Sequence, residues 1–125
     1  MSSNKTWHLA IDEDELKIIE LELRLWRIYY GFIRWQERCE KFANSLELSC
    51  DEIAVLHIIR MTETPKTIYD IGLILNRDDH FNIQYNVKKL IEKGLIDKVI
   101  SPKNRKQYQY FPTQKGIQDT DRYAK

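Results

Sequence analysis

Apolar residues recur at helical spacing over roughly 35 residues at the start of the chain, from Ile11 to Leu46. The stretch holds no proline and a single glycine, Gly31, so it lacks the residues that most readily break a helix. An average globular helix has only about 11–12 residues. The pattern therefore predicts one very long helix within residues 11–48, preceded by a loosely packed or disordered N-terminus at residues 1–10.

Two apolar seams run along this predicted helix. They are offset by two residues, and a helix turns by about 100° per residue, so the seams lie on nearly opposite sides. A helix that is apolar on two sides must be covered twice. We expect the long seam to pack on the chain's own domain and the short seam to join a second copy in a homodimer. The long seam is Ile18, Leu21, Leu25, Ile28, Phe32, Trp35, Cys39, Phe42 and Leu46, and the short dimer seam is Leu16, Ile19, Leu23, Trp26, Tyr30 and Ile33.

Two capping signals follow the long helix. The Ser49 hydroxyl can accept the N–H of Glu52 while the Glu52 carboxylate reaches back, which is the arrangement of a capping box. Pro65 interrupts the chain after the helix that this box opens, and Thr67 with Asp70 caps the next helix, at residues 68–76. The expected apolar positions are Ile53, Val55, Leu56, Ile59 and Met61 in the first helix and Ile71, Leu73, Ile74 and Leu75 in the second.

A fourth helix is predicted after the polar turn at residues 77–80. Its apolar residues recur at i, i+4, i+7 and i+8, which gives one buried face. The opposite face carries amide, phenol and ammonium groups, which bind base edges and phosphates. Two short helices, a turn and a presented helix form a helix-turn-helix. The buried face is Ile83, Val87, Leu90 and Ile91, and the opposite face is Asn82, Gln84, Tyr85, Lys88 and Lys89.

A β-hairpin is predicted directly after this helix. Gly94 suits the position after a helix that needs positive φ. Residues 95–101 and 107–111 have the composition of strands, with a polar tip at residues 102–105 between them. The expected fold class is mainly α (α+β), a winged helix-turn-helix with a two-stranded β wing at residues 49–116. A short C-terminal helix at residues 117–125 completes the chain and is expected to contribute to the dimer interface.

Charge changes the picture locally. The chain has 125 residues, enough for one domain with its own core, and a net charge of only +1. Between Gln84 and Tyr110, however, seven basic residues stand against two acidic ones, Glu92 and Asp97. Such a local basic surface is typical of a protein that binds nucleic acid. The basic residues are Lys88, Lys89, Lys93, Lys98, Lys103, Arg105 and Lys106.

Other function classes find little support in the sequence. Cys39 and Cys50 form no CxxC pair and no secretory signal precedes them, so a reducing cytoplasm is expected. The three histidines lie far apart, so neither a metal site nor a catalytic set can be assembled, and we expect no enzyme activity and no cofactor. Of these histidines, His57 lies among apolar residues and is expected to be a hydrogen-bonded core residue.

Three motifs resemble the winged helix-turn-helix of MarR-type transcription regulators. They are LIEKGLI (Leu90–Ile96), the basic tip after it and TQKG (Thr113–Gly116). The likeness covers about Cys50 to Gly116, and the long first helix is similar to this family's dimerisation element. The resemblance implies a homodimer that binds a pseudo-palindromic duplex in the cytoplasm of a prokaryote, associated with the nucleoid. It leaves open whether a small-molecule effector is sensed.

The resemblance also assigns residues to DNA. It places Asn82, Gln84, Tyr85 and Lys88 on the exposed face of a recognition helix and Arg105 at the wing tip. In the major groove, amide side chains bind an adenine edge with two hydrogen bonds. We therefore expect base contacts from Asn82, Gln84 and Tyr85, and backbone or wing contacts from Thr67, Lys88, Lys89, Lys103, Arg105 and Lys106.

An alternative interpretation is a winged-helix protein-protein interaction module with little DNA affinity. Asp78 and Asp79 place acidic groups beside the expected phosphate path, and the overall charge is low. In this reading, the apolar seams and the aromatic wing residues Tyr108, Tyr110 and Phe111 bind another polypeptide.

Overall fold

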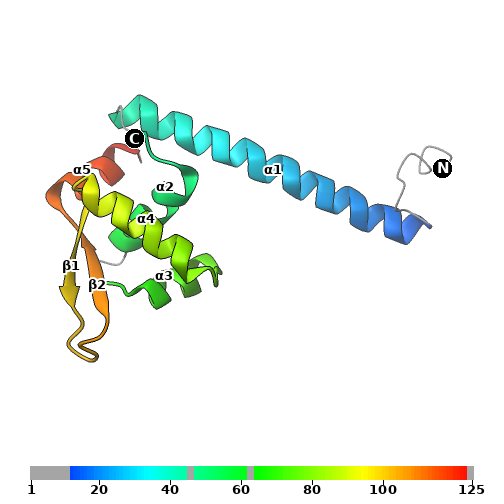
Figure 1. Cartoon of the computed structure of the whole chain (residues 1–125). Helices are drawn as coiled ribbons and strands as arrows, with labels where there is room; N and C mark the ends of the chain where they lie inside the picture. Colours follow the sequence, from blue (N-terminus) through cyan, green and yellow to red (C-terminus); the bar gives the residue numbers. More distant parts are fainter. Residues whose placement is uncertain (1–11, 45–46, 62–63, 124–125) are drawn as a thin grey trace. The chain divides into compact units, whose positions relative to one another are not determined.

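A computed structural model of the chain describes residues 12–44, 47–61 and 64–123. Within these residues, five helices and one two-stranded antiparallel sheet follow one another (Figure 1). The fold class predicted from the sequence, mainly α with a β wing, is thereby confirmed. The elements are α1 (Glu13–Asn44), α2 (Cys50–Arg60), α3 (Ile68–Leu75), α4 (His80–Glu92), β1 (Ile96–Ile100), β2 (Tyr108–Pro112) and α5 (Gln114–Tyr123).

The chain forms two compact units, Met1–Trp35 and Gln36–Lys125, and α1 contributes to both. Within the first unit, the Asp12 carboxylate accepts the N–H of Glu15 at 2.8 Å and so caps the start of α1. The first turn is acidic, which the helix dipole favours. The N-terminus predicted at residues 1–10 lies outside the described residues. No described helix is both long enough and apolar enough to cross a membrane.

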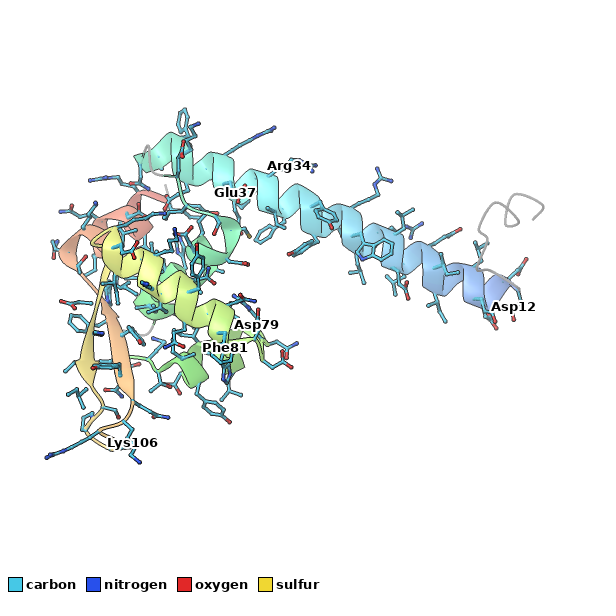
Figure 2. All side chains as sticks on the ribbon, viewed as in Figure 1. Asp12, Arg34, Glu37, Asp79, Phe81 and Lys106 are labelled. Carbon is cyan, nitrogen blue, oxygen red and sulfur yellow. The ribbon has the colours of Figure 1, made fainter. Side chains whose placement is uncertain are left out.

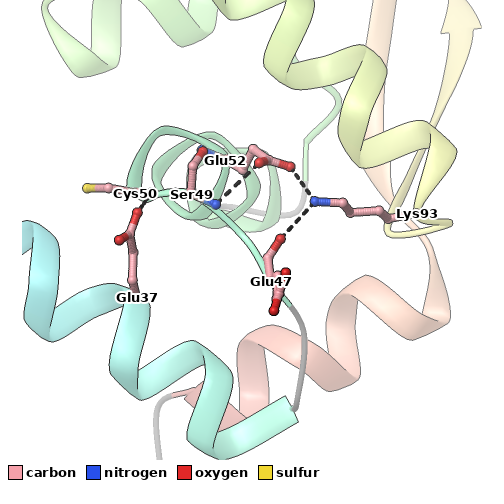
Figure 3. Close-up of polar contacts among 6 residues, drawn as sticks. All are labelled: Glu37, Glu47, Ser49, Cys50, Glu52 and Lys93. Carbon is pink, nitrogen blue, oxygen red and sulfur yellow. Dashed lines mark hydrogen bonds and ion pairs between the residues drawn. The ribbon is translucent and has the colours of Figure 1, made fainter.

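The predicted capping box at the start of α2 is confirmed. The Ser49 hydroxyl accepts the Glu52 N–H at 3.2 Å, and the Glu52 carboxylate accepts the Ser49 N–H at 3.2 Å. Two further groups converge there (Figure 3): Glu37 of α1 accepts the Cys50 N–H at 2.9 Å, and Lys93 donates to Glu52 at 2.8 Å. The N-terminus of α2 is therefore the point where the end of α1 and the end of α4 are attached.

The core lies between α2, α4 and the start of the hairpin. The apolar faces predicted for α2 and α4 are confirmed, except that Met61 is exposed and Ile91 is half-buried. In α3, Ile71 is buried and Leu75 packs against the core as predicted, whereas Leu73 and Ile74 are exposed and were wrongly predicted. The core covers this eight-residue helix only on the side of Ile68, Ile71, Gly72 and Leu75. The buried core is Leu48, Ile53, Val55, Leu56, Ile59, Ile71, Ile83, Val87, Leu90, Leu95, Ile96 and Tyr110.

In the part of α1 that belongs to the second unit, the long apolar seam is covered only at Cys39, which is half-buried, and this corrects the sequence prediction there. Within the second unit, Phe42 of this seam is 93% exposed, and Leu46 lies outside the described residues. The end of α1 is attached instead through polar side chains, because the groups facing it are a helix N-terminus and a carbonyl. Glu37 binds the Cys50 N–H, and Asn44 donates to the Asp119 carbonyl at 3.4 Å.

A buried carboxyl pair lies where α1 meets α5. Glu40 is fully buried and Asp119 nearly so. Burial, together with a hydrogen bond to Asp119, raises the pKa of Glu40 to about 8. The Glu40 carboxyl therefore keeps its proton to a much higher pH than an exposed carboxyl does, and Asn44 donates to one of its oxygens at 2.7 Å.

His57 lies near this pair. Burial lowers the pKa of His57, and its ring packs edge-on against Tyr123 with centroids 4.7 Å apart. Its Nε2 is buried and meets no hydrogen-bond partner among the described residues. At this nitrogen, the prediction of a hydrogen-bonded core histidine is wrong, because the ring packs against the Tyr123 ring through an aromatic contact.

The hairpin is held at its base. β1 and β2 pair antiparallel, from Ile96 opposite Pro112 to Ile100 opposite Tyr108. Gly94 has φ of 75°, which confirms the expected left-handed residue after α4. Lys66, before α3, adds a bridge to β2 on the side away from β1: its N–H donates to the Tyr110 carbonyl at 3.0 Å, and the Tyr110 N–H donates back at 2.7 Å.

We predict that Gly116→Ala destabilises the fold. A Cβ atom at Gly116 would lie 2.0 Å from the Leu95 carbonyl oxygen, a backbone atom that cannot move aside cheaply. We expect the free energy of unfolding to fall by about 1–3 kcal/mol or more, since overpacking usually costs this much. Urea titrations followed by circular dichroism measure the change.

The matched control is Gly31→Ala. A Cβ there has only an Arg34 guanidinium nitrogen near it, at 4.0 Å. Because alanine is the better helix former, this variant should be neutral or stabilised by about 0.5–1 kcal/mol. Equal stability of the two alanine variants would contradict the prediction.

Candidate nucleic-acid interface

The turn before α4 is fixed by a charged network. The Arg77 guanidinium donates to both Asp79 oxygens, at 2.8 and 2.7 Å. These hydrogen bonds hold the pKa of Asp79 well below its usual range. Asp79 is the N-cap residue of α4, but its carboxylate accepts no backbone N–H of the helix and instead accepts the Asn82 side-chain amide at 3.2 Å. The side-chain amide of Asn82 is thus already a hydrogen-bond donor within the protein.

Helix α4 separates a buried face from an exposed one. Ile83, Val87 and Leu90 are buried in the core. The exposed face carries the residues predicted to read bases and one that the sequence analysis did not name, Phe81. Phe81 lies three and four residues before Gln84 and Tyr85, so helical spacing alone would have placed it on their face. The exposed residues are Phe81, Asn82, Gln84, Tyr85 and Lys88.

A groove of about 570 Å³ runs between α4 and the hairpin. It brings together three predicted residues, Gln84, Tyr85 and Lys88, and two that were not assigned to DNA, Phe81 and Lys98. Lys98 counted only toward the basic total of the segment; its ammonium group lies 4.4 Å from the centre of the Tyr108 ring. The remaining lining residues are Val87, Ile91, Glu92 and Tyr110.

A smaller groove of about 180 Å³ lies between the start of α3, α4 and the wing. It gathers Thr67, Gln84 and Lys106 from three separate segments. The Thr67 hydroxyl accepts the Asp70 N–H at 3.1 Å in the predicted cap, so only its proton remains for a phosphate oxygen. The other lining residues are Ile68, Tyr69, Gln107, Tyr108 and Tyr110.

The basic residues divide into exposed and structural ones. Lys103, Arg105 and Lys106 are exposed at the wing tip, where Figure 2 labels Lys106. Lys89 lies beside Tyr85, with its Nζ 5.3 Å from the ring centre, and a hydrogen bond to that phenol raises the pKa of Lys89. Lys93 is not part of a DNA-facing surface, because it binds Glu52 and the Glu47 carbonyl (Figure 3).

The residues predicted for the dimer seam differ in exposure. Leu16 is only 5% exposed, so it is already covered within the single chain. Ile19, Leu23 and Ile33 are half-buried, whereas Trp26 and Tyr30 are exposed. Among the long-seam residues, Ile18, Leu21, Leu25, Ile28, Phe32 and Trp35 are exposed as well.

Residues 48–116 match the family model of the winged helix DNA-binding domain. Because this match covers more than half of the chain, the chain belongs to the family of winged helix DNA-binding domains. It spans the segment from the end of the α1–α2 loop through the wing to the start of α5. Among curated proteins, no sequence matches the chain.

Solved structures share the fold. A MarR family transcription regulator superposes with a TM-score of 0.73 at 15% identity, over 86% of this chain and 68% of that one. Two similar structures contain DNA. FabT of Streptococcus pneumoniae has a TM-score of 0.66 at 18% identity, over 81% of this chain and 69% of its own. MepR of S. aureus has 0.62 at 14% identity, over 81% and 80%. The predicted MarR-type likeness is confirmed as a common fold.

Proposed function

We propose that the chain is a sequence-specific transcription regulator that binds double-stranded DNA as a homodimer on a pseudo-palindromic site. The observation that carries this proposal is the groove between α4 and the wing, where Gln84, Tyr85 and Lys88 lie together on the exposed side of a helix whose other side is the core. Fold and family support DNA as the ligand, and we place the protein in the cytoplasm of a prokaryote, with its genome.

In this proposal the N-terminal half of α4 enters the major groove. Asn82, Gln84 and Tyr85 contact base edges, with the Asn82 amide oriented by Asp79. The ammonium and guanidinium groups on α4 and at the wing tip neutralise phosphates, and the wing lies against the backbone and minor groove. These groups belong to Lys88, Lys89, Lys103, Arg105 and Lys106, and the Thr67 hydroxyl donates to a phosphate beside them.

Homodimerisation through α1 supplies the second half-site. The helix exposes Trp26 and Tyr30 together with the large side chains of the other seam, more apolar surface than a single chain ordinarily leaves in water. A second copy of the same helix is self-complementary and closes the assembly at two chains. Ile19, Leu23 and Ile33 would then be fully covered, while Leu16 contributes little because it is already buried.

Selection of bound sequences from a random duplex pool tests the function. We expect a palindromic product whose half-sites lie about one helical turn apart, roughly 34–36 Å centre to centre. The structure also offers apolar and aromatic surface to a protein partner, which is the second candidate function. No enrichment, and no duplex affinity better than about 10⁻⁴ M at low salt, would replace the DNA proposal with that alternative.

We predict different defects for basic and polar residues of the site. Lys88→Ala and Arg105→Ala each remove one phosphate contact, so binding to every duplex weakens and the slope of log K against log salt falls by about one. Gln84→Ala removes a base contact, so selected and random duplexes become harder to distinguish. Fluorescence anisotropy on both duplexes between 50 and 200 mM salt measures these effects. Equal loss on both duplexes for Gln84→Ala would contradict its role as a base reader.

A further inference from the structure

Phe81 is the most exposed large apolar side chain of the winged-helix elements that follow α1. It is 89% exposed, in the first turn of α4, next to Asp79 (Figure 2). We propose that Phe81 is a specificity-determining residue that contacts the C5-methyl group of a thymine in the major groove. This inference rests on the proposed function, because it needs a duplex in front of α4.

The fold does not use the Phe81 ring. The buried face of α4 is formed by Ile83, Val87 and Leu90, and Phe81 is absent from the core and from the residues packed against it. An exposed phenyl ring orders water around it, and removing that water is favourable only when a partner covers the ring. The side chain is therefore available for an intermolecular contact, and replacing it should leave stability unchanged.

The backbone that carries Phe81 is held in place. Two residues before it, Asp79 is clamped by Arg77, and one residue after it, the Asn82 amide binds the same carboxylate. The first turn of α4 is thus fixed from both sides before any ligand arrives. Residues at the N-terminal end of a recognition helix reach base edges, so in the proposed complex Phe81 lies in the part of α4 that enters the major groove of the DNA.

The surroundings of Phe81 favour a polyanion over an acidic or apolar protein. The groove that it lines also holds Gln84, Tyr85 and the ammonium groups of Lys88 and Lys98, with Glu92 as the acidic member of the lining. An apolar ring surrounded by amide, phenol and ammonium groups fits a surface with isolated apolar spots among acceptors and phosphates. The major-groove face of duplex DNA has this composition, and its apolar spots are thymine methyl groups.

Uracil substitution tests the contact one methyl group at a time. In the duplex enriched by selection, each thymine is replaced in turn by uracil, which removes the methyl group and keeps the base pair. For the wild-type protein, one thymine position in each half-site should be sensitive. Replacing a single thymine at that position should weaken binding about fourfold, the usual effect of losing one buried methyl group. For Phe81→Ala, the thymine and uracil duplexes should bind equally at that position, whereas Phe81→Leu should keep part of the preference.

Leu73→Ala is the matched control, since it removes an exposed apolar side chain from α3 and should leave the thymine preference intact. Circular dichroism checks that all variants are folded. A thymine preference that is as large in Phe81→Ala as in the wild type would overturn this inference and leave the proposed function standing. Failure of the wild type to select any duplex would overturn both together.

Discussion

Replacing Leu23 and Trp26 of α1 by aspartate is expected to make the protein monomeric and to lower its affinity for a palindromic duplex by roughly 10²–10⁴-fold. Leu23 is half-buried and Trp26 is exposed in the single chain, so the fold does not depend on covering them. Carboxylates on the seam would have to be buried unpaired between two helices, which opposes association. Sedimentation at micromolar protein measures the mass, and a mobility shift measures the affinity.

The loss should be confined to paired sites. When two winged-helix domains are joined in a dimer, binding of one domain brings the other to its half-site at an effective concentration of about a millimolar. A monomer lacks this advantage. Affinity for an isolated half-site should therefore be unchanged. Aspartates placed at Arg24 and Arg27, on the flank between the seams, provide the control and should leave the dimer intact. A variant at Leu23 and Trp26 that still sediments as a dimer would refute this role for the seam.

Glu40→Gln is expected to remove a pH dependence of stability. The pKa of Glu40 is about 8 in the folded protein against an ordinary value of 4.5, so the folded state holds the proton more tightly than the unfolded state does. Its contribution to stability is complete below pH 4.5 and is lost as pH rises through 8, by up to about 1.4 kcal/mol per pH unit. Glutamine does not ionise, so the variant should keep its stability where the wild type loses it.

Urea titrations between pH 7 and 8.5 isolate this effect. The lowered pKa of His57 concerns a more acidic range, and the raised pKa values of Cys50, Tyr110 and Tyr123 concern a more alkaline one. Asp119→Asn, which replaces the facing carboxylate by an amide donor, should also flatten the profile. If the stability of Glu40→Gln declines with pH as steeply as that of the wild type over this range, a group other than Glu40 causes the decline.

The elements that the sequence predicts well are those encoded by local spacing. The capping boxes at Ser49 and Thr67, the buried face of α4 and the left-handed Gly94 all depend on residues a few positions apart, and each is found as predicted. The attachment of α1 was not predictable in this way. Its apolar seams suggest a hydrophobic contact, whereas the domain offers backbone groups that only polar side chains satisfy.

In the candidate site too, features set by local spacing were predicted, and contacts between distant segments were not. Gln84, Tyr85 and Lys88 are found together in one groove because helical spacing places them on one face. Phe81 was missed because it lies at the boundary between the predicted turn and the helix and was assigned to neither face of the helix. Lys93 was counted as part of a basic surface because charge counting along a chain cannot show that a lysine is bound to Glu52, forty-one residues away in sequence.

Because the hairpin is anchored near its base, the residues of its tip can be replaced with little effect on the rest of the fold. Lys66 and Tyr110 join the middle of β2 to the segment before α3, and just after β2 the Thr113 hydroxyl donates to the Gly94 carbonyl at 2.6 Å. Between these contacts and the tip, the hairpin is held by the ladder of the two strands and by the contact of Lys98 with the Tyr108 ring. The loop at residues 102–106 therefore sets how far the wing reaches, and its length or charge can change without any cost to the core. In the proposed complex with DNA, substitutions in this loop therefore change the phosphate contacts of the wing and leave the base contacts of α4 unaltered.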